Sequence, residues 1–329
     1  MVSTMSSLDC LLPLMQHRGV KLSAAEFQHI VNTTFHAFES EVYDEIHKGM
    51  WDSLDQQFQL LAADALRDAQ DIPETLVAVD VGCGTGLSAE LLRRTQLGRR
   101  ISRLCLVDTA PEMLARAAQR ASSWGIELEL VEGTLDDVTA KRFDLVLVCS
   151  VLHHLPNLTS FFASVQRLQP RGGLFIHLQD PNGDYRQDPE FAARQQQLRA
   201  AALRPSTGLR RFTPARIARH LKARFAAPGT DRYIKKVNEA LLARGVIDSP
   251  MTADEMWHVT DLHVYDGGLS ISQMTRDLNS YELLSKRSYG FFGELWSDLP
   301  SAFRAYEEEL IRQRALNGRE LAGVWQKRA

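Results

Sequence analysis

The sequence has no apolar run that approaches the roughly 18 residues a membrane-spanning helix needs. The only apolar stretch near its start, residues 10–15, follows Asp9 with no basic segment before it, which argues against a secretory signal. A strong excess of one charge is also missing, since 38 Lys and Arg face 41 Asp and Glu, a net charge of −3. With 44% apolar residues, the composition excludes disordered, collagen-like and coiled-coil chains and predicts a soluble globular protein.

Cysteine is scarce, and the four cysteines fit no metal-ligand spacing. Three of them, Cys83, Cys105 and Cys149, lie in or beside apolar segments, where free thiols pack as small hydrophobic groups. We therefore expect a reducing, cytoplasmic setting. The sequence shows no internal repeat and no low-complexity tract beyond residues 195–197.

The chain is longer than a single core usually grows, so we expect a large insertion or a second domain. Apolar residues recur at helical spacing over residues 21–71, which predicts a helical N-terminal cap over residues 1–72. A helical pattern rich in Gln, Ala and Arg returns over residues 181–268. We expect that segment to be a helical insertion that forms a substrate lid.

Residues 73–180 alternate short apolar runs with amphipathic stretches, a pattern typical of a parallel sheet with helices on both faces. Helices are expected after Gly86, Pro111 and Pro156. Residues 269–329 are expected to complete the sheet. The expected strands are 76–81, 104–108, 127–131, 143–149, 173–179, 281–289 and 321–326.

The most informative segment is residues 77–86, V-A-V-D-V-G-C-G-T-G. A strand runs into three glycines at alternate positions and then into a helix that begins near Leu87. Glycine lets the backbone turn sharply and lets a ligand approach the main chain, where a Cβ atom would collide. The spacing differs from the dinucleotide fingerprint G-x-G-x-x-G, because Leu87 stands where the third glycine belongs. A nicotinamide dehydrogenase is therefore disfavoured.

Two acidic residues narrow the range of ligands that the loop could bind. Asp80 precedes the first glycine by two residues and could receive an ammonium group. Asp108 ends the second expected strand, where the ribose diol of a bound nucleoside would lie. Together they favour an adenosine ligand with an amino-acid tail. Alternatively, Asp108 caps the helix that begins at Pro111, and Met113 is a core residue of that helix.

Five motifs occur in order between residues 75 and 180: V-D-V-G-C-G-T-G, V-D-T-A-P-E-M-L-A-R-A, V-E-G-T-L-D-D, F-D-L-V-L-V-C-S-V-L-H-H-L and P-R-G-G-L-F-I. In these motifs the chain resembles the class I, Rossmann-like S-adenosylmethionine-dependent methyltransferases. The resemblance implies an α/β fold with a seven-stranded, mostly parallel sheet whose last strand is antiparallel. It also implies S-adenosylmethionine as the cofactor.

The resemblance assigns cofactor contacts to eleven positions. One position departs from the usual pattern, because many relatives have an aspartate where Thr134 follows Gly133, while here the acids come later as Asp136 and Asp137. A backbone group at Leu135 could replace that aspartate at the adenine edge. The implied contacts are Asp80, Gly82, Cys83 and Gly84 with the methionine portion, Asp108 with the ribose hydroxyls and Thr109 beside it, Met113, Thr134 and Leu135 with adenine, and Cys149 and Ser150 near the sulfonium.

Methyl transfer from a sulfonium is an in-line displacement, which needs a base only when the acceptor must lose a proton. His153 and His154 follow the fourth expected strand at its carboxyl end, where open parallel sheets bind ligands. A neutral imidazole there could take such a proton. Alternatively, one of the two histidines caps the next helix and orders the loop before Pro156.

Three further groups are candidates for binding the acceptor. Tyr43 and His47 share a helical face and could line the pocket, or they belong to a buried aromatic stripe. Residues 194–224 hold nine Lys and Arg and no acid; in this stretch Arg210 and Arg211 are expected in a loop, where they could hold a carboxylate. Alternatively, the basic stretch is a solvated helix face. His263 lies among histidines and acids that lack a full ligand set, so no metal is expected.

We therefore expect methyl transfer to a small or medium organic acceptor, of the kind found in natural-product or metabolite biosynthesis, with N-, O- and C-methylation open. An anionic acceptor or a carrier protein would suit the basic stretch. Nucleic acid is disfavoured because aromatic residues do not interleave with the arginines, and self-association stays open. One alternative is an enzyme that uses the bound cofactor for a cyclisation or rearrangement, and another is a non-catalytic cofactor-binding module.

Overall fold

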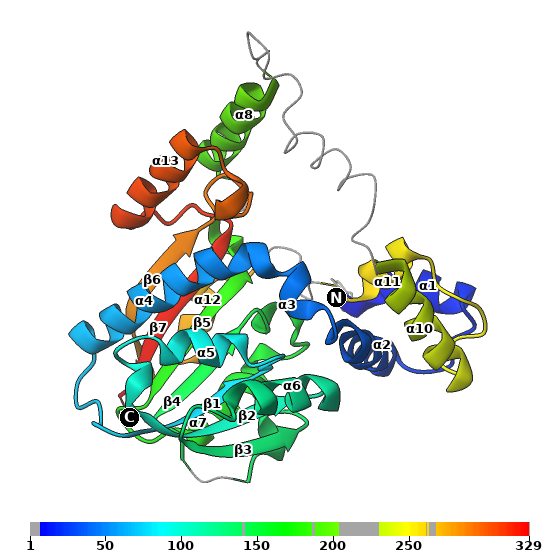
Figure 1. Cartoon of the computed structure of the whole chain (residues 1–329), viewed down its shortest axis with the longest axis horizontal. Helices are drawn as coiled ribbons and strands as arrows, with labels where there is room; N and C mark the ends of the chain where they lie inside the picture. Colours follow the sequence, from blue (N-terminus) through cyan, green and yellow to red (C-terminus); the bar gives the residue numbers. More distant parts are fainter. Residues whose placement is uncertain are drawn as a thin grey trace, which may run out of the picture. The chain divides into compact units, whose positions relative to one another are not determined.

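The computed structural model describes residues 7–139, 142–185, 188–203, 230–260, 262 and 268–328 (Figure 1). The chain divides into two compact units. The first, here called the helical unit, comprises Met1–Glu41 and Ala193–Leu262, and the second, the sheet unit, comprises Val42–Ala192 and His263–Ala329. The expected cap over residues 1–72 is thus shared between the units. The cap and lid roles expected from the sequence stay predictions.

The sheet unit contains one seven-stranded sheet of order β3-β2-β1-β4-β5-β7-β6 (Figure 1). β7 runs antiparallel to both of its neighbours, and the other described pairings are parallel. The predicted Rossmann-like α/β fold with an antiparallel last strand is therefore confirmed. The strands are β1 Leu76–Val81, β2 Ile101–Asp108, β3 Glu127–Glu132, β4 Leu145–Cys149, β5 Leu174–Pro181, β6 Tyr281–Tyr289 and β7 Glu320–Lys327.

Helices were predicted after Gly86, Pro111 and Pro156, and they begin within one residue of these positions, at Leu87, Pro111 and Leu158. Pro111 stands at the first helical position, where its missing N–H costs nothing. The Asn157 side chain accepts from the Ser160 N–H and caps the next helix. The helices are α3 Tyr43–Ile46, α4 Trp51–Asp68, α5 Leu87–Arg93, α6 Pro111–Ala121, α7 Leu158–Leu168, α12 Ile271–Asp277 and α13 Ser301–Arg312, while α8 Pro189–Leu203 crosses the boundary between the units.

Several predicted strand ends were wrong. β2 begins at Ile101 rather than at residue 104, and β5 continues to Pro181. β4 begins at Leu145 rather than at residue 143, because the Phe143 N–H donates to the carbonyl of Leu168 at the end of α7. Short 3-10 turns also lie between the elements: η2 Lys48–Met50, η3 Gly98–Arg100, η4 Leu135–Asp137, η5 Leu152–His154, η6 Gly183–Tyr185 and η8 Trp296–Asp298.

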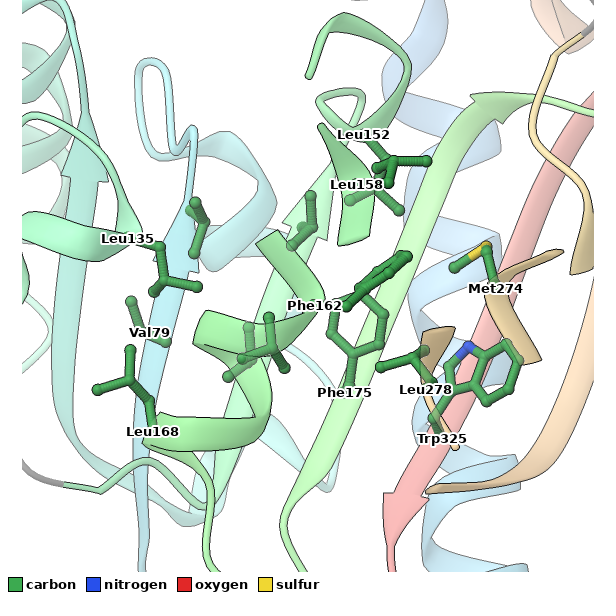
Figure 2. Packing of buried hydrophobic residues seen from close by; sticks show 14 of the residues in the cluster. Val79, Leu135, Leu152, Leu158, Phe162, Leu168, Phe175, Met274, Leu278 and Trp325 are labelled. Carbon is green, nitrogen blue, oxygen red and sulfur yellow. The ribbon is translucent and has the colours of Figure 1, made fainter. Parts of the chain in front are cut away.

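A cluster of buried apolar residues packs α7 and α12 against one face of the sheet (Figure 2). Phe162 of α7 meets Phe175 of β5 edge to face, with ring centroids 5.9 Å apart. Met274 and Leu278 extend the cluster to Trp325 of β7, which is fully buried. β4 and β5 contribute residues to this cluster, and the candidate site described below lies at their carboxyl ends.

α4 is joined to β6 by a buried ion cluster around Asp64. The Asp64 carboxylate accepts from Arg287 Nε at 2.6 Å, from Ser285 Oγ at 2.5 Å and from Arg314 at 2.6 Å. A register shift between Leu283 and Ser285 turns the second half of β6 toward this acid. Burial by itself would raise the pKa of Asp64, but the contacts with Arg287 and Ser285 outweigh it and lower the pKa from its usual 3.8 to about 2.

The Asp64→Asn variant should lose about 3 kcal/mol of unfolding free energy, because Arg287 stays buried without its counter-ion. Asp68→Asn is the matched control on the same helix; its carboxylate forms only a partly exposed pair with Arg67, so the loss should stay below about 1 kcal/mol. Urea unfolding measures both values. Because folding lowers the pKa of Asp64, the stabilisation is present above about pH 4 and is lost as the pH falls through about 2. Equal losses in the two variants would contradict this account.

The helical unit contains α1 Leu12–His17, α2 Ala24–Glu39, α10 Thr230–Ala243 and α11 Ala253–Thr260, with the 3-10 turn η1 Ser7–Leu11. A capping box between Ser23 and Glu26 starts α2. The ring of Phe35 meets Tyr233 of α10 and Trp257 of α11 edge to face, at centroid distances of 5.4 and 5.1 Å. These aromatic contacts join segments about two hundred residues apart in the chain.

Among the described residues, no helix is both long enough and apolar enough to cross a membrane.

Candidate active site

The candidate site lies at the carboxyl edge of the sheet. It lies next to β1, where the strands that follow in sequence switch from one side of β1 to the other. β2 and β3 follow on one side of β1, and β4 and β5 lie on its other side. Open parallel sheets bind ligands at this crossover between β1 and β4. The register places Val81 of β1 beside both Val107 of β2 and Val148 of β4. The loops after all three strands therefore leave the sheet at the same edge.

The glycine loop after β1 has the left-handed backbone that its sequence predicts. Gly82, Gly84 and Gly86 have φ values of +66°, +52° and +80°. A Cβ atom on Gly82 would lie 2.5 Å from Cγ2 of Val151, and one on Gly86 would lie 3.1 Å from the Cα atom of Ala117. A Cβ atom on Gly84 would meet nothing within 4 Å. The main chain at Gly84 therefore faces open space, whereas Gly82 and Gly86 are needed for packing.

Asp80, at the end of β1, is fully buried. Its Oδ2 accepts from Ser88 Oγ at 2.6 Å, while Oδ1 has no hydrogen-bond partner among the described residues. Burial, and to a lesser extent the negative charge of Asp108, raises the pKa of Asp80 to about 7. A buried carboxylate oxygen without a donor is costly, so an incoming ammonium group would be stabilised there.

Asp108, at the end of β2, reaches across to the glycine loop. Its Oδ2 accepts from the Gly84 N–H at 2.8 Å, and its Oδ1 accepts from the Ala110 N–H at 2.9 Å. Each carboxylate oxygen has two lone pairs, so the side chain can still accept from two hydroxyl groups. The helix-capping interpretation is wrong, because the N-cap residue of α6 is Ala110 and no side chain caps the helix, although the bond to the Ala110 N–H orders the turn before it. The same bonds hold its carboxylate beside Gly84.

The residues expected at the adenine lie around the end of β3 and the start of α6. Met113 and Leu135 are buried, and Thr109 is half-buried. The exposed Thr134 hydroxyl caps η4, since it donates to Asp137 Oδ2 at 3.0 Å and accepts from the Asp136 N–H at 3.3 Å. The side chain of Thr134 is therefore occupied within its own turn, and its contact with adenine stays a prediction.

The loop after β4 brings the remaining predicted residues to the same edge. Cys149 ends the strand, and burial raises the pKa of its thiol well above the usual value. Ser150 has a φ of +60°, a strained conformation for a residue with a Cβ atom. His153 is buried and lies against His154, with ring centroids 3.9 Å apart. Both histidines thus lie where the sequence placed them, and a catalytic role for either one stays a prediction.

Tyr43 and His47 also belong to the sheet unit, and their rings lie 4.4 Å apart. Between them, Asp44 accepts from the hydroxyl of Thr85 in the glycine loop at 2.6 Å and pairs with Arg120 of α6. Arg120 also donates from Nε to the Thr85 carbonyl at 2.8 Å. α3 is therefore fastened to the glycine loop.

Three of the residues expected to bind the acceptor lie outside the described residues: Arg210, Arg211 and His263. Residues 204–224 of the basic stretch lie outside them as well. Their roles stay predictions. Within the part of the chain that the structure describes, no group of three or more His, Cys, Asp or Glu side chains could hold a metal ion.

Sequence reasoning missed two groups at this edge. Ser88 donates to Asp80, and its place two residues after the last glycine was an available signal. Asp180 is the last but one residue of β5, and its Oδ1 lies 2.7 Å from Nδ1 of His153. Its position at the carboxyl end of a strand next to β4 could have singled it out.

These residues fit S-adenosylmethionine. Oδ1 of Asp80, which has no hydrogen-bond partner among the described residues, suits an ammonium group, and the carboxylate of Asp108 suits the ribose diol. A Cβ atom on Gly84, whose N–H donates to Asp108, would meet nothing within 4 Å. The fold and this edge define a class I nucleoside-binding α/β domain. A family profile described as "Methyltransferase domain" matches residues 79–177, so this part of the chain is a class I S-adenosylmethionine-dependent methyltransferase domain.

Curated relatives share this domain. The chain is 28% identical over 156 residues to the ubiquinone biosynthesis O-methyltransferase of Xanthomonas axonopodis pv. citri (strain 306), covering 45% of this chain and 63% of that protein. It is 35% identical over 103 residues to the protein of the same name from Methylobacterium sp. (strain 4-46), covering 31% of this chain and 39% of that protein. The similarity thus spans less than two thirds of either relative.

Solved structures are similar over most of the chain. The plantazolicin methyltransferase in complex with SAH is 12% identical, with a TM-score of 0.46, covering 98% of this chain and 99% of that one. An S-adenosylmethionine-dependent methyltransferase from Mesorhizobium loti is 18% identical, with a TM-score of 0.38, covering 80% of this chain and 96% of that one.

The Gly84→Ala variant should weaken binding of S-adenosylhomocysteine at least tenfold, about 1.4 kcal/mol or more, because the new methyl group fills the open space beside Asp108. The left-handed backbone should cost about 1–2 kcal/mol of stability. Gly125→Ala is the matched control, since Gly125 has a φ of +66° and nothing within 4 Å of a Cβ atom, but it lies in the turn between α6 and β3. Calorimetry and urea unfolding should show equal destabilisation in the two variants and a loss of binding only in Gly84→Ala. Unchanged binding in Gly84→Ala would show that the loop does not border the ligand.

Proposed function

We propose that this protein transfers the methyl group of S-adenosylmethionine to a small or medium organic acceptor. The observation that carries the proposal is the group formed by Gly84, Asp80 and Asp108 at the crossover of the sheet. Asp80 is buried, Asp108 is half-buried, and Gly84, whose N–H donates to Asp108, has nothing within 4 Å of the place of a Cβ atom. The curated relatives are named as O-methyltransferases, which supports an oxygen acceptor.

When bound, S-adenosylmethionine supplies an electrophilic methyl group on a sulfonium. The chain's own task is then to orient the two reactants and to exclude water. Asp80 and Asp108 would hold the two ends of the cofactor, with Cys149 and Ser150 at the edge of β4 beside the methyl group. Tyr43, His47, Arg210, Arg211 and His263 are the residues that we propose for the acceptor. Arg210 and Arg211 would favour an anionic one.

Two rival functions predict different products. An enzyme that rearranges its substrate with the cofactor bound would give a product of unchanged mass. A non-catalytic binding module would give tight binding and no turnover. Methyl transfer adds one methyl group to the acceptor and releases S-adenosylhomocysteine, so mass spectrometry of the product separates the three functions.

The Asp108→Ala variant should raise the dissociation constant of S-adenosylhomocysteine at least tenfold, roughly the value of one charge-assisted hydrogen bond. Glu127→Ala is the control, since Glu127 is an exposed acid at the start of β3, at the opposite edge of the sheet. Isothermal titration calorimetry on both variants measures the change. If the wild-type protein gives no heat of binding with S-adenosylhomocysteine, the proposed function is wrong. If the affinity of Asp108→Ala is unchanged, Asp108 does not belong to the site.

Cofactor binding should also depend on pH through Asp80. Its pKa of about 7 means that this acid is mostly ionised at pH 8 and mostly protonated at pH 6. An ammonium group binds the ionised form, so affinity for S-adenosylhomocysteine should fall about tenfold from pH 8 to pH 6. Asp80→Asn should bind weakly and lose this dependence. An equally steep dependence in Asp80→Asn would assign the proton to another group.

A further inference from the structure

α3 is too short to hold its own position. It has four residues, Tyr43–Ile46, none of which is buried, and the residue before it, Val42, makes no side-chain capping bond. A single helical turn is unstable by itself in water, because its formation fixes several residues for few hydrogen bonds. The positions of Tyr43 and His47, which we propose for the acceptor, therefore depend on the bonds that this segment makes to other elements.

Asp44 connects α3 with the glycine loop. Its Oδ1 accepts from the Thr85 hydroxyl at 2.6 Å, and its Oδ2 accepts from a terminal nitrogen of Arg120 in α6. Thr85 is buried and stands between Gly84 and Gly86 in the sequence of the loop. One oxygen of the Asp44 carboxylate is therefore bonded to the glycine loop, and the other is bonded to α6.

Arg120 joins three elements through one guanidinium group. Its Nε donates to the Thr85 carbonyl at 2.8 Å, and its two terminal nitrogens pair with Asp44 of α3 and Glu90 of α5. Arg94 donates to the other oxygen of Glu90 at 2.5 Å. Burial by itself would raise the pKa of Glu90, but the bonds from the two arginines outweigh it and lower the pKa. The planar fork of donors on arginine is what allows one side chain to bind all three groups.

The same loop contains the open position of the candidate cofactor site. Gly84, directly before Thr85, donates its N–H to Asp108 at 2.8 Å, and a Cβ atom there would meet nothing within 4 Å. Directly after Thr85, a Cβ atom on Gly86 would lie 3.1 Å from the Cα atom of Ala117, so α6 also packs against the end of the loop. A ligand at Gly84 would therefore meet a loop whose next residue is bonded to both α3 and α6.

We propose that Arg120 is a positioning residue that joins α3 to the glycine loop through Asp44 and Thr85, so that cofactor bound at the loop fixes the acceptor residues on α3. The proposal rests on the proposed function. Cofactor binding and the ordering of α3 are then coupled, and such a coupling is reciprocal, because each stabilises the other by the same factor. Lysine cannot replace the arginine, since its ammonium group is a point charge without the fork of donors that reaches Thr85, Asp44 and Glu90 together.

Amide hydrogen exchange in α3 tests the coupling, measured by NMR without ligand and with saturating S-adenosylhomocysteine. The probes are the N–H groups of Glu45, Ile46 and His47, which donate to carbonyls of the same turn. In the wild type the ligand should slow their exchange about tenfold or more, a typical factor for coupled sites. Ligand binding that leaves α3 exchange unchanged would overturn this proposal and leave the proposed function standing. Absence of any binding to the wild type would overturn both.

Asp44→Ala and Arg120→Lys should reduce this slowing to less than about twofold and, by reciprocity, weaken S-adenosylhomocysteine binding about fivefold. Alanine forms helices better than aspartate, so the loss in Asp44→Ala cannot come from helix propensity. Glu45→Ala is the matched control, because Glu45 is the exposed acid next to Asp44 in the same turn, and it should keep the wild-type slowing. A pair that only stabilised the fold would change the urea midpoint and leave the slowing by ligand intact. Full slowing in Asp44→Ala, or an equal loss in Glu45→Ala, would overturn the proposal.

A double-mutant cycle gives a second measurement, from the S-adenosylhomocysteine affinities of Thr85→Val, Asp44→Ala and the double variant. The bond from Thr85 to Asp44 is already broken in Asp44→Ala, so the added Thr85→Val change should weaken binding by no more than about twofold. Single losses that multiply in the double variant would show that the two residues act independently, and they would overturn the proposal.

Discussion

The close approach of Gly82 to Val151 sets the geometry of the whole carboxyl edge. A Cβ atom at Gly82 would lie 2.5 Å from Val151, so only glycine lets the loop after β1 lie against the loop after β4. That contact brings the glycine loop and the paired histidines together, although about seventy residues separate them in the sequence. The order of strands around β1 makes the approach possible, and the missing side chain of Gly82 makes it close.

Glycines with the same kind of backbone have different uses along this loop. Val151 occupies the space beside Gly82, and Ala117 occupies the space beside Gly86. Gly84 instead faces open space, and its N–H donates to Asp108. The N–H of Gly84 donates to the carboxylate of Asp108, which we propose as the group that binds the ribose. Binding there would therefore place the nucleoside against the one glycine of the three that packing does not require.

The strands and helices of the sheet unit could be predicted from the sequence because the signals that form them lie within a few neighbouring residues. The bounds of β1 and β6 were predicted correctly, and α6 begins at Pro111, because apolar runs and a first-turn proline act within a few residues. The ion cluster of Asp64 and the register shift of β5 between His177 and Asp180 could not be predicted, because each depends on partners from distant strands. The grouping of residues 1–41 with 193–262 was missed for the same reason. Its aromatic contacts join Phe35 to Tyr233 and Trp257.

Two buried acids at the same edge have opposite electrostatics, and this contrast argues for opposite roles. Asp80 has Ser88 as its side-chain donor, and burial raises its pKa to about 7, so its site lacks a positive charge. Asp180 is equally buried, yet its pKa is lowered because His153 and His177 face it. A buried acid whose charge the chain does not balance is a candidate ligand-binding group, whereas an acid that the chain already pairs is not. On this argument Asp80 is completed by a ligand from outside, while the chain itself supplies the partner of Asp180.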